Sequence, residues 1–165
     1  MKVFTWIFAG VAGCALALGC DDGPGADEQG CGPAEATVTR VIDGDTIELD
    51  SGERVRYLMI DTPESTIEHE CWGEEAKAAN EALVAGQTVR LRYDEECTDD
   101  YDRLLAYVEL SGHEINRVMV ERGHACVLHI PPNGDAVADE YETLEYEARM
   151  LDKGLWAACD PTPCG

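Results

Sequence analysis

The stretch Arg56-Tyr-Leu-Met-Ile-Asp-Thr-Pro-Glu64 constrains the fold of this chain more than any other. Residues 55–60 predict a strand, with side chains alternating between two faces. Pro63 has no N–H and disfavours helical backbone at the residue before it, so the strand must end there. One arginine and the carboxylates of Asp61 and Glu64 therefore lie within a strand length of one another. Such a set of groups suits a metal ion and a phosphate.

A second acidic turn, Asp43-Gly-Asp45, lies upstream between two β-branched runs. Taken alone, an Asp-Gly-Asp sequence is most often only a turn. Two acidic turns on neighbouring strands, however, offer several carboxylate oxygens to one hard cation. The pair predicts a shared cation site more strongly than either turn by itself.

The remaining periodicity predicts a single α+β domain. Alternating or β-branched runs indicate strands, and apolar residues at helical spacing that end at glycines indicate helices. The strands are expected at 37–41, 46–49, 55–60, 88–93 and 104–110, and the helices at 74–85, 115–122 and 135–152. Five short strands suit a small closed sheet, and the five-stranded oligonucleotide-binding barrel is one candidate.

The first 33 residues differ in composition from the rest. Residues 1–19 are apolar after Lys2 and read as an export signal. Leu16-Ala-Leu-Gly-Cys20 is similar to a bacterial lipobox, so we expect Cys20 to carry lipid; ordinary signal cleavage nearby is the alternative. Residues 20–33 are acidic and glycine-rich, typical of a flexible linker, and residues 34–165 form the folded domain. We expect an exported protein, either a lipoprotein of the cell envelope (periplasmic or on the outer surface) or a secreted one.

Cysteine usage agrees with export. Cys14 belongs to the leader and Cys20 to the lipobox, which leaves six cysteines in the body. These are Cys31, Cys71, Cys97, Cys126, Cys159 and Cys164. An even number in an oxidising compartment predicts three disulfides, whereas the lack of any Cys-x-x-Cys pair makes a zinc site the weaker alternative.

The net charge argues against long-range attraction of a polyanion. The chain carries 12 basic and 34 acidic residues, for a formal charge of −22. Half of the basic residues are nevertheless arginines that lie on or beside the predicted strands: Arg40, Arg54, Arg56, Arg90, Arg92 and Arg103. Local attraction by these arginines must therefore work against the overall field.

Six motifs together resemble the staphylococcal (thermonuclease-type) nuclease family. They are Val41-Ile-Asp-Gly-Asp-Thr46, the Arg56–Glu64 stretch, Trp72-Gly-Glu-Glu-Ala76, Asp99-Asp-Tyr-Asp-Arg-Leu-Leu-Ala-Tyr107, Ile115-Asn116 and Gly154-Leu-Trp156. The resemblance implies a five-stranded oligonucleotide-binding barrel with three helices. It also implies a calcium-dependent phosphodiesterase that cuts DNA and RNA.

The resemblance also implies a ligand set and a base. Asp45 and Asp61 would bind Ca²⁺ through carboxylates, and Thr62 through its backbone carbonyl. Glu64 would position or deprotonate the attacking water. The chemistry agrees with this implication, because Ca²⁺ takes oxygen ligands and a carboxylate beside a metal is a suitable base for water.

The same resemblance assigns Arg56 and Arg103 to the scissile phosphate and Tyr101 to the substrate pocket. The planar guanidinium donates to two phosphate oxygens at once, which an ammonium does not do. The family's Tyr-Gly-Arg is Tyr101-Asp-Arg103 in this chain. Glycine often serves a turn with positive φ, and Asp102 tolerates that conformation better than most residues.

One disulfide pairing is expected from the same comparison. Cys71 precedes the first predicted helix, and Cys97 lies in the segment leading to Arg103. The resemblance implies that both segments flank the active site, so we predict a Cys71–Cys97 bridge. The other four cysteines would form two further bridges, with the C-terminal pair tied back to the body.

These observations predict an exported, monomeric, calcium-dependent nuclease with DNA or RNA as its partner. Its membrane contact would be a lipid anchor only. The rival interpretation is a catalytically silent barrel that binds protein or nucleic acid on the cell envelope. All five catalytic-type side chains are present, which favours the enzyme. Only the leader favours a third alternative, a purely structural envelope lipoprotein.

Overall fold

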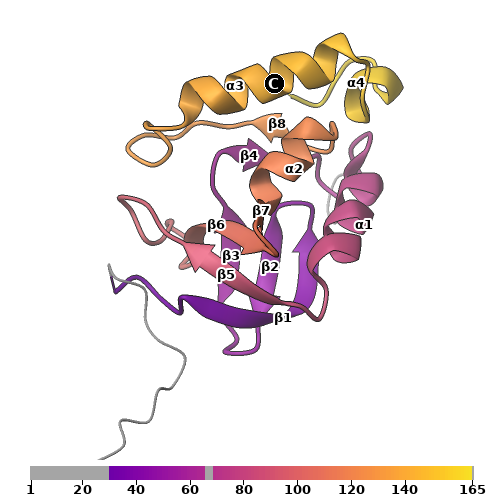
Figure 1. The fold of residues 1–165 in the computed structure, drawn as a ribbon. Helices are drawn as coiled ribbons and strands as arrows, with labels where there is room; N and C mark the ends of the chain where they lie inside the picture. The colour runs from indigo at the N-terminus through magenta and orange to yellow at the C-terminus, as the bar shows by residue number, and fades with distance from the viewer. Residues whose placement is uncertain (1–29, 66–68, 165) are drawn as a thin grey trace, which may run out of the picture.

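The computed structural model describes residues 30–65 and 69–164 (Figure 1). The predicted export signal and the lipidation site at Cys20 lie outside the described residues. Residues 31–33, placed at the end of the linker by sequence, are joined to the folded body. Cys31 forms a disulfide with Cys97, and the Pro33 carbonyl accepts a hydrogen bond from the Tyr93 hydroxyl.

Five strands form a closed barrel, as predicted. They are β1 (Glu35–Asp43), β2 (Thr46–Leu49), β3 (Arg54–Tyr57), β5 (Thr88–Arg92) and β6 (Leu104–Leu110). The sheet runs β3-β2-β1-β5-β6, and parallel pairing of β3 with β6 closes it. A short β7 (His113–Glu114) pairs antiparallel with the end of β6. The expected oligonucleotide-binding barrel of the α+β class is thereby confirmed.

The predicted third strand is not continuous. β3 ends at Tyr57, and a separate β4 (Ile60–Asp61) pairs with β8 (Cys126–Val127) outside the barrel. Met59 between them has φ of 68°, which no strand residue adopts. The break leaves backbone carbonyls of this stretch free to accept hydrogen bonds from the Arg56 guanidinium, and strand alternation therefore fails after Tyr57.

Three helices occur where helical spacing predicted them, with shifted ends. They are α1 (Gly73–Val84), α2 (Ile115–Glu121) and α3 (Ala138–Met150). α3 begins three residues after the predicted start, because the Val137 N–H donates to the Gly134 carbonyl in a turn. A further short helix, α4 (Leu155–Ala158), was not predicted. Among the described residues, no helix has the length and apolarity needed to cross a membrane.

The helices cover the barrel in layers. Figure 1 shows α1 beside β1, and α2 between the barrel and α3. The barrel interior is filled by side chains such as Val38, Ile47 and Val55, and α3, outside the barrel, buries Tyr141 and Ala148. One core therefore supports both the strands that carry the acidic turns and the loops around them.

The six body cysteines form three disulfides, as predicted, but the Cys71–Cys97 pairing is wrong. The bridges are Cys31–Cys97, Cys71–Cys159 and Cys126–Cys164. The chain after α4 folds back along the α1 and β8 side, which brings it to Cys71 and Cys126. The N-terminal arm lies beside Cys97 instead. The prediction that the C-terminal pair is tied back to the body is confirmed.

Gly123 is expected to be one of the least replaceable residues. It has φ of 71°, and a Cβ there would overlap the Lys153 carbonyl oxygen where the end of α2 meets the start of α4. Gly86 has φ of 70° with open space around it, so Gly86→Ala is the matched control. The control should lose about 1–2 kcal/mol of unfolding free energy, and Gly123→Ala roughly 1–3 kcal/mol more.

Urea unfolding followed by tryptophan fluorescence would measure both variants. Equal losses of unfolding free energy in the two variants would mean that the backbone around Gly123 shifts to accommodate the added Cβ at no cost in stability.

Candidate active site

The two acidic turns meet at Asp45. This residue is buried, with 5% exposed. Its Oδ2 accepts hydrogen bonds from the Thr62 backbone N–H at 2.8 Å and from the Thr62 hydroxyl at 3.0 Å. Gly44 permits the approach, because a Cβ there would lie 2.7 Å from the Thr62 side chain. The sequence prediction that the two turns are neighbours is borne out by this contact.

Arg56 joins both turns. Its Nη2 donates to Asp61 Oδ1 at 2.7 Å, and its Nη1 lies 3.2 Å from Asp45 Oδ2. The same Nη1 donates to the carbonyls of Tyr57 and Ile60, at 3.0 and 2.7 Å. The guanidinium is thus held in one orientation from four directions, which reduces the entropy lost when it binds an anion.

A cluster of carboxylates surrounds Arg56. Burial, followed by the neighbouring Asp45, raises the pKa of Asp43 to about 7. Burial also raises the pKa of Asp61, where Arg56 opposes the rise, and the pKa of Glu64, to which Asp45 and Asp61 add. Crowded carboxylates with raised pKa values lower their free energy by binding a cation, so this donor set fits a hard metal ion.

The carboxylates are not gathered as tightly as in a preformed cage. Among the described residues, the one trio of His, Cys, Asp or Glu with ligand atoms all within 4.8 Å is Cys126, Glu145 and Cys164. Its two cysteines are joined as a disulfide. Opposite oxygens of a calcium site lie up to about 5 Å apart, so the acidic cluster suits a site that backbone carbonyls and water complete.

Three residues to which the sequence assigned no role in the site support the acidic turns. Asp43 belongs to the cluster and accepts the Asp45 N–H at 3.2 Å. Glu70 accepts the Glu64 N–H at 2.9 Å. Asn80 of α1, fully buried, donates to the Asp43 carbonyl and accepts from the Tyr57 hydroxyl. Asp43 was visible in its motif. Glu70 acts six residues along the chain from Glu64, and Asn80 acts 37 residues from Asp43; neither carries a local sequence signal.

Arg103 lies at the end of the loop between β5 and β6. Asp99 Oδ2 accepts from its Nε at 2.7 Å, and Asp99 Oδ1 accepts the backbone N–H groups of Tyr101 and Arg103. Burial opposes ionisation of Asp99, but the hydrogen bonds from Arg103 hold its pKa below the ordinary value. Asp102 has φ of 58°, so the predicted positive-φ turn is present without glycine.

Both arginines line one pocket of about 390 Å³. Apolar side chains form much of the rest of its wall, and Tyr101 is 72% exposed at its edge, with the Arg103 guanidinium carbon 5.5 Å from its ring centroid. The other lining residues include Leu58, Glu96, Asp100, Leu128, Ile130 and Asn133. The volume accommodates a nucleotide-sized group beside two guanidinium groups.

The predicted site residues thus fall into two groups that share Arg56. Asp45, Asp61 and Thr62 are in direct contact with Arg56 or with one another. Arg103 and Tyr101 lie along the pocket that Arg56 also lines. A phosphate in the pocket would have arginines beside it and the carboxylate cluster at one end. This arrangement can bind a phosphodiester and a cation together.

Sequence comparison adds independent information. The model of the family described as "Staphylococcal nuclease homologue" matches residues 54–158. This range includes Arg56, Asp61, Glu64 and Arg103, and it ends at the last residue of α4.

Individual relatives are similar over most of this chain. The "SPbeta prophage-derived endonuclease YokF" of Bacillus subtilis is 32% identical over 130 residues, which cover 74% of this chain and 44% of YokF. An "Uncharacterized endonuclease" of Escherichia coli is 37% identical over 137 residues, which cover 81% of this chain and 84% of the relative. A "Thermonuclease" of Staphylococcus intermedius is 37% identical over 125 residues, which cover 72% of this chain and 74% of the relative. The chain therefore spans less than half of YokF.

Proposed function

Because this chain belongs to the staphylococcal nuclease family, we propose that it is a calcium-dependent nuclease that hydrolyses phosphodiester bonds of DNA, RNA or both. The observation that carries the proposal is the contact of Arg56 with Asp45 and Asp61 at the mouth of a pocket shared with Arg103. The names of the relatives agree with it.

The acidic side of the site would hold the cation and the water. Asp45, Asp61 and the Thr62 carbonyl are the proposed ligands for Ca²⁺, which supplies positive charge beside the scissile phosphate when bound. Glu64 orients the attacking water and accepts its proton. The Glu64 N–H donates to Glu70 Oε2 and the Glu64 carbonyl accepts the Glu70 N–H, both at 2.9 Å, which holds the Glu64 backbone in place for this task.

The arginines act on the phosphate. Phosphoryl transfer spreads negative charge over the equatorial oxygens, so catalysis depends mainly on positioning and charge stabilisation. Arg56 is oriented by two carbonyls, and Arg103 by Asp99, before any substrate binds. Each guanidinium keeps further N–H donors for phosphate oxygens.

A silent barrel that only binds nucleic acid or protein is the second candidate. The same pocket and arginines would serve binding, but binding alone gives no reason for a carboxylate cluster with raised pKa values beside them. Turnover of labelled single-stranded DNA and RNA with Ca²⁺, and with a chelator in its place, separates the two. Tight binding without cleavage in either buffer would establish the silent barrel.

Export and anchoring are separate proposals that rest on the leader alone. We propose that residues 1–19 direct export and that Cys20 carries lipid. Separately, we propose that the mature protein is monomeric. Mass spectrometry of the protein from membranes and medium would test the lipid on Cys20. Sedimentation of the purified protein would test the monomer.

Salt should first raise and then lower the activity. The charge of −22 repels a polyanion at long range, and added NaCl shortens that repulsion until the Debye length is about 8–10 Å. Contacts of Arg56 and Arg103 with phosphate are short and partly desolvated, so they weaken less at first. We expect kcat/KM at saturating Ca²⁺ to pass through a maximum as NaCl increases.

Folding stability should rise over the same salt range, because repulsion between acidic residues is screened. Fluorescence of Trp72 and Trp156 in the same buffers reports the folded fraction and separates the two effects. If the protein is folded at every NaCl concentration and kcat/KM only declines, local attraction by the arginines controls association with the substrate, and the net charge does not.

A further inference from the structure

The loop between β5 and β6, residues 93–103, contributes a large part of the pocket lining. Asp99, Tyr101 and Arg103 all belong to it. The loop has few buried apolar side chains, so hydrophobic packing alone does not fix it. Its attachments to the rest of the molecule therefore decide where Arg103 lies.

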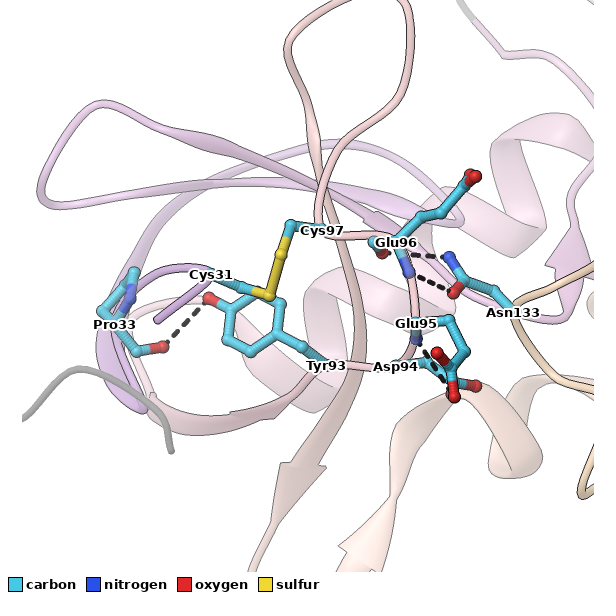
Figure 2. The surroundings of a disulfide bond; sticks show 8 residues. All are labelled: Cys31, Pro33, Tyr93, Asp94, Glu95, Glu96, Cys97 and Asn133. Atoms are coloured by element: carbon cyan, nitrogen blue, oxygen red, sulfur yellow. Dashed lines mark hydrogen bonds between the residues drawn. A yellow bond between two sulfur atoms is a disulfide. The ribbon is translucent and has the colours of Figure 1, made fainter. Parts of the chain in front are cut away.

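The first attachment is covalent. Cys97 is bonded to Cys31 of the N-terminal arm, 66 residues away in sequence (Figure 2). The arm is itself held against β5, because the Leu91 N–H donates to the Ala34 carbonyl at 2.8 Å and the Tyr93 hydroxyl donates to the Pro33 carbonyl at 3.0 Å. The bridge thus ties the loop to the barrel wall.

The second attachment comes from the segment before α3. The Glu96 N–H donates to Asn133 Oδ1 at 2.8 Å, and Asn133 Nδ2 donates to the Glu96 carbonyl at 3.0 Å (Figure 2). Asn133 is buried, with 3% exposed. The Gly134 N–H adds a bond to Asp94 Oδ2 at 2.8 Å. Adjacent loop residues are therefore held by a disulfide and by a reciprocal amide pair.

Backbone hydrogen bonds connect the segment around Cys97 to the strands that carry or adjoin both arginines. The Cys97 carbonyl accepts the Leu105 N–H at 2.8 Å, and the Asp99 N–H donates to the Arg103 carbonyl at 3.1 Å. Leu105 stands opposite Arg56 in the parallel β3–β6 pairing. A shift of Cys97 therefore moves Arg103 relative to Arg56.

The proposed calcium ligands are supported by other parts of the chain. Asp45 is held by Thr62 and the β1–β2 turn, and Asp61 lies in β4 opposite Cys126. Cys126 belongs to a different disulfide, with Cys164. The two sides of the site are thus fastened by different bridges.

We infer that the Cys31–Cys97 disulfide and Asn133 form a clamp that positions Arg103 against Arg56 for the reaction, a role that rests on the proposed nuclease function. None of the three residues is catalytic. The clamp acts through Arg103, so its loss should reduce kcat and leave calcium binding intact.

The test compares three forms of the purified protein. The double variant Cys31→Ser with Cys97→Ser removes the bridge without leaving a free thiol. Its kcat should fall about 10-fold to 100-fold, the scale of an ångström-sized misplacement of a catalytic group. The Ca²⁺ concentration for half-maximal activity should change less than about two-fold, as expected when the ligands are undisturbed. Gly86→Ala, outside the pocket lining, controls for lost stability and should keep wild-type kcat.

Hydrogen exchange gives a reading that does not need activity. The amides of Arg103 and Leu105 should exchange faster in the double variant than in Gly86→Ala, while the amide of Thr62 stays protected. The variant Cys126→Ser with Cys164→Ser should show the opposite pattern, with a higher calcium requirement. If the double variant fails to fold, Asn133→Ala takes its place in the test. The Leu105 amide should then exchange faster in Asn133→Ala than in Gly86→Ala.

The outcomes separate the clamp from the function. An active wild type, with kcat and exchange in the double variant equal to those of Gly86→Ala, would overturn the clamp alone. A calcium requirement that rises in parallel with the loss of kcat would also overturn it, because the whole site would then have loosened. An inactive wild type would overturn the nuclease proposal, and exchange at Leu105 would still decide whether the clamp exists.

Discussion

Arg103→Ala is expected to lower kcat by about 10³-fold or more while the domain stays folded, the scale associated with an arginine that stabilises transferring phosphate. The side chain is on the rim of the pocket, and apart from Asp99 it makes no hydrogen bond that is recorded within residues 30–65 and 69–164. Its removal therefore breaks side-chain hydrogen bonds to Asp99 alone among the described residues. Asp99 keeps its backbone donors at Tyr101 and Arg103.

Two further variants make the test specific. Arg103→Lys keeps the charge but loses the planar fork, so most of the activity should still be lost. Arg90→Ala removes an exposed β5 arginine that lies outside the pocket lining, and should leave kcat close to wild type. Single-turnover cleavage at saturating substrate, with circular dichroism for the fold, measures all three. Near-wild-type kcat in Arg103→Ala would remove Arg103 from the reaction.

Removal of calcium is expected to have an effect of similar size. A chelator should reduce turnover by about 10³-fold or more, because a metal that stabilises transition-state charge contributes several kcal/mol and each tenfold corresponds to about 1.4 kcal/mol. Calcium should also stabilise the fold, since it relieves repulsion among Asp43, Asp45 and Asp61. At a free calcium concentration 100-fold above its Kd, the unfolding free energy should increase by about 2.7 kcal/mol, which corresponds to roughly 5–10 °C in Tm.

The thermal shift tests the ligand set independently of turnover. Asp61→Asn keeps the shape and an acceptor for Arg56 but loses the charge, so the Tm shift should need more calcium. Asp152→Asn alters an exposed aspartate in the turn after α3 and should respond as wild type does. Equal shifts in both variants, or full activity in chelator, would show that the acidic cluster does not hold a catalytic metal.

The expected disulfide shows where sequence reasoning ends. The number of bridges followed from an even cysteine count in a body behind an export-type leader, and three bridges are present. The partner of Cys71 depended on where the chain end returns after α4, which no local pattern encodes. Cys159 and Cys164 lie within the last residues, and only packing of that segment against α1 and β8 brings them to their partners.

The polar residues of the site also fall into two groups: those that local sequence indicated and those that only the fold revealed. Asp45, Asp61 and Arg56 stand in turns and strands whose chemistry is local, so the sequence indicated them. Asn80 and Asn133 act on segments 37 residues away, and a lone asparagine in a helix or loop carries no signal of that kind.

The sequence by itself determined the order of the five barrel strands and the three longer helices, the two acidic turns and the stop at Pro63. Alternation, helical spacing and turn residues are properties of a few neighbouring residues, and they survive without knowledge of the rest of the chain. Tertiary structure alone decided the break after Tyr57, the disulfide partners and the position of Arg103 relative to Arg56. Each of these depends on contacts between segments far apart in the chain, whose free energy exists only once the barrel has closed.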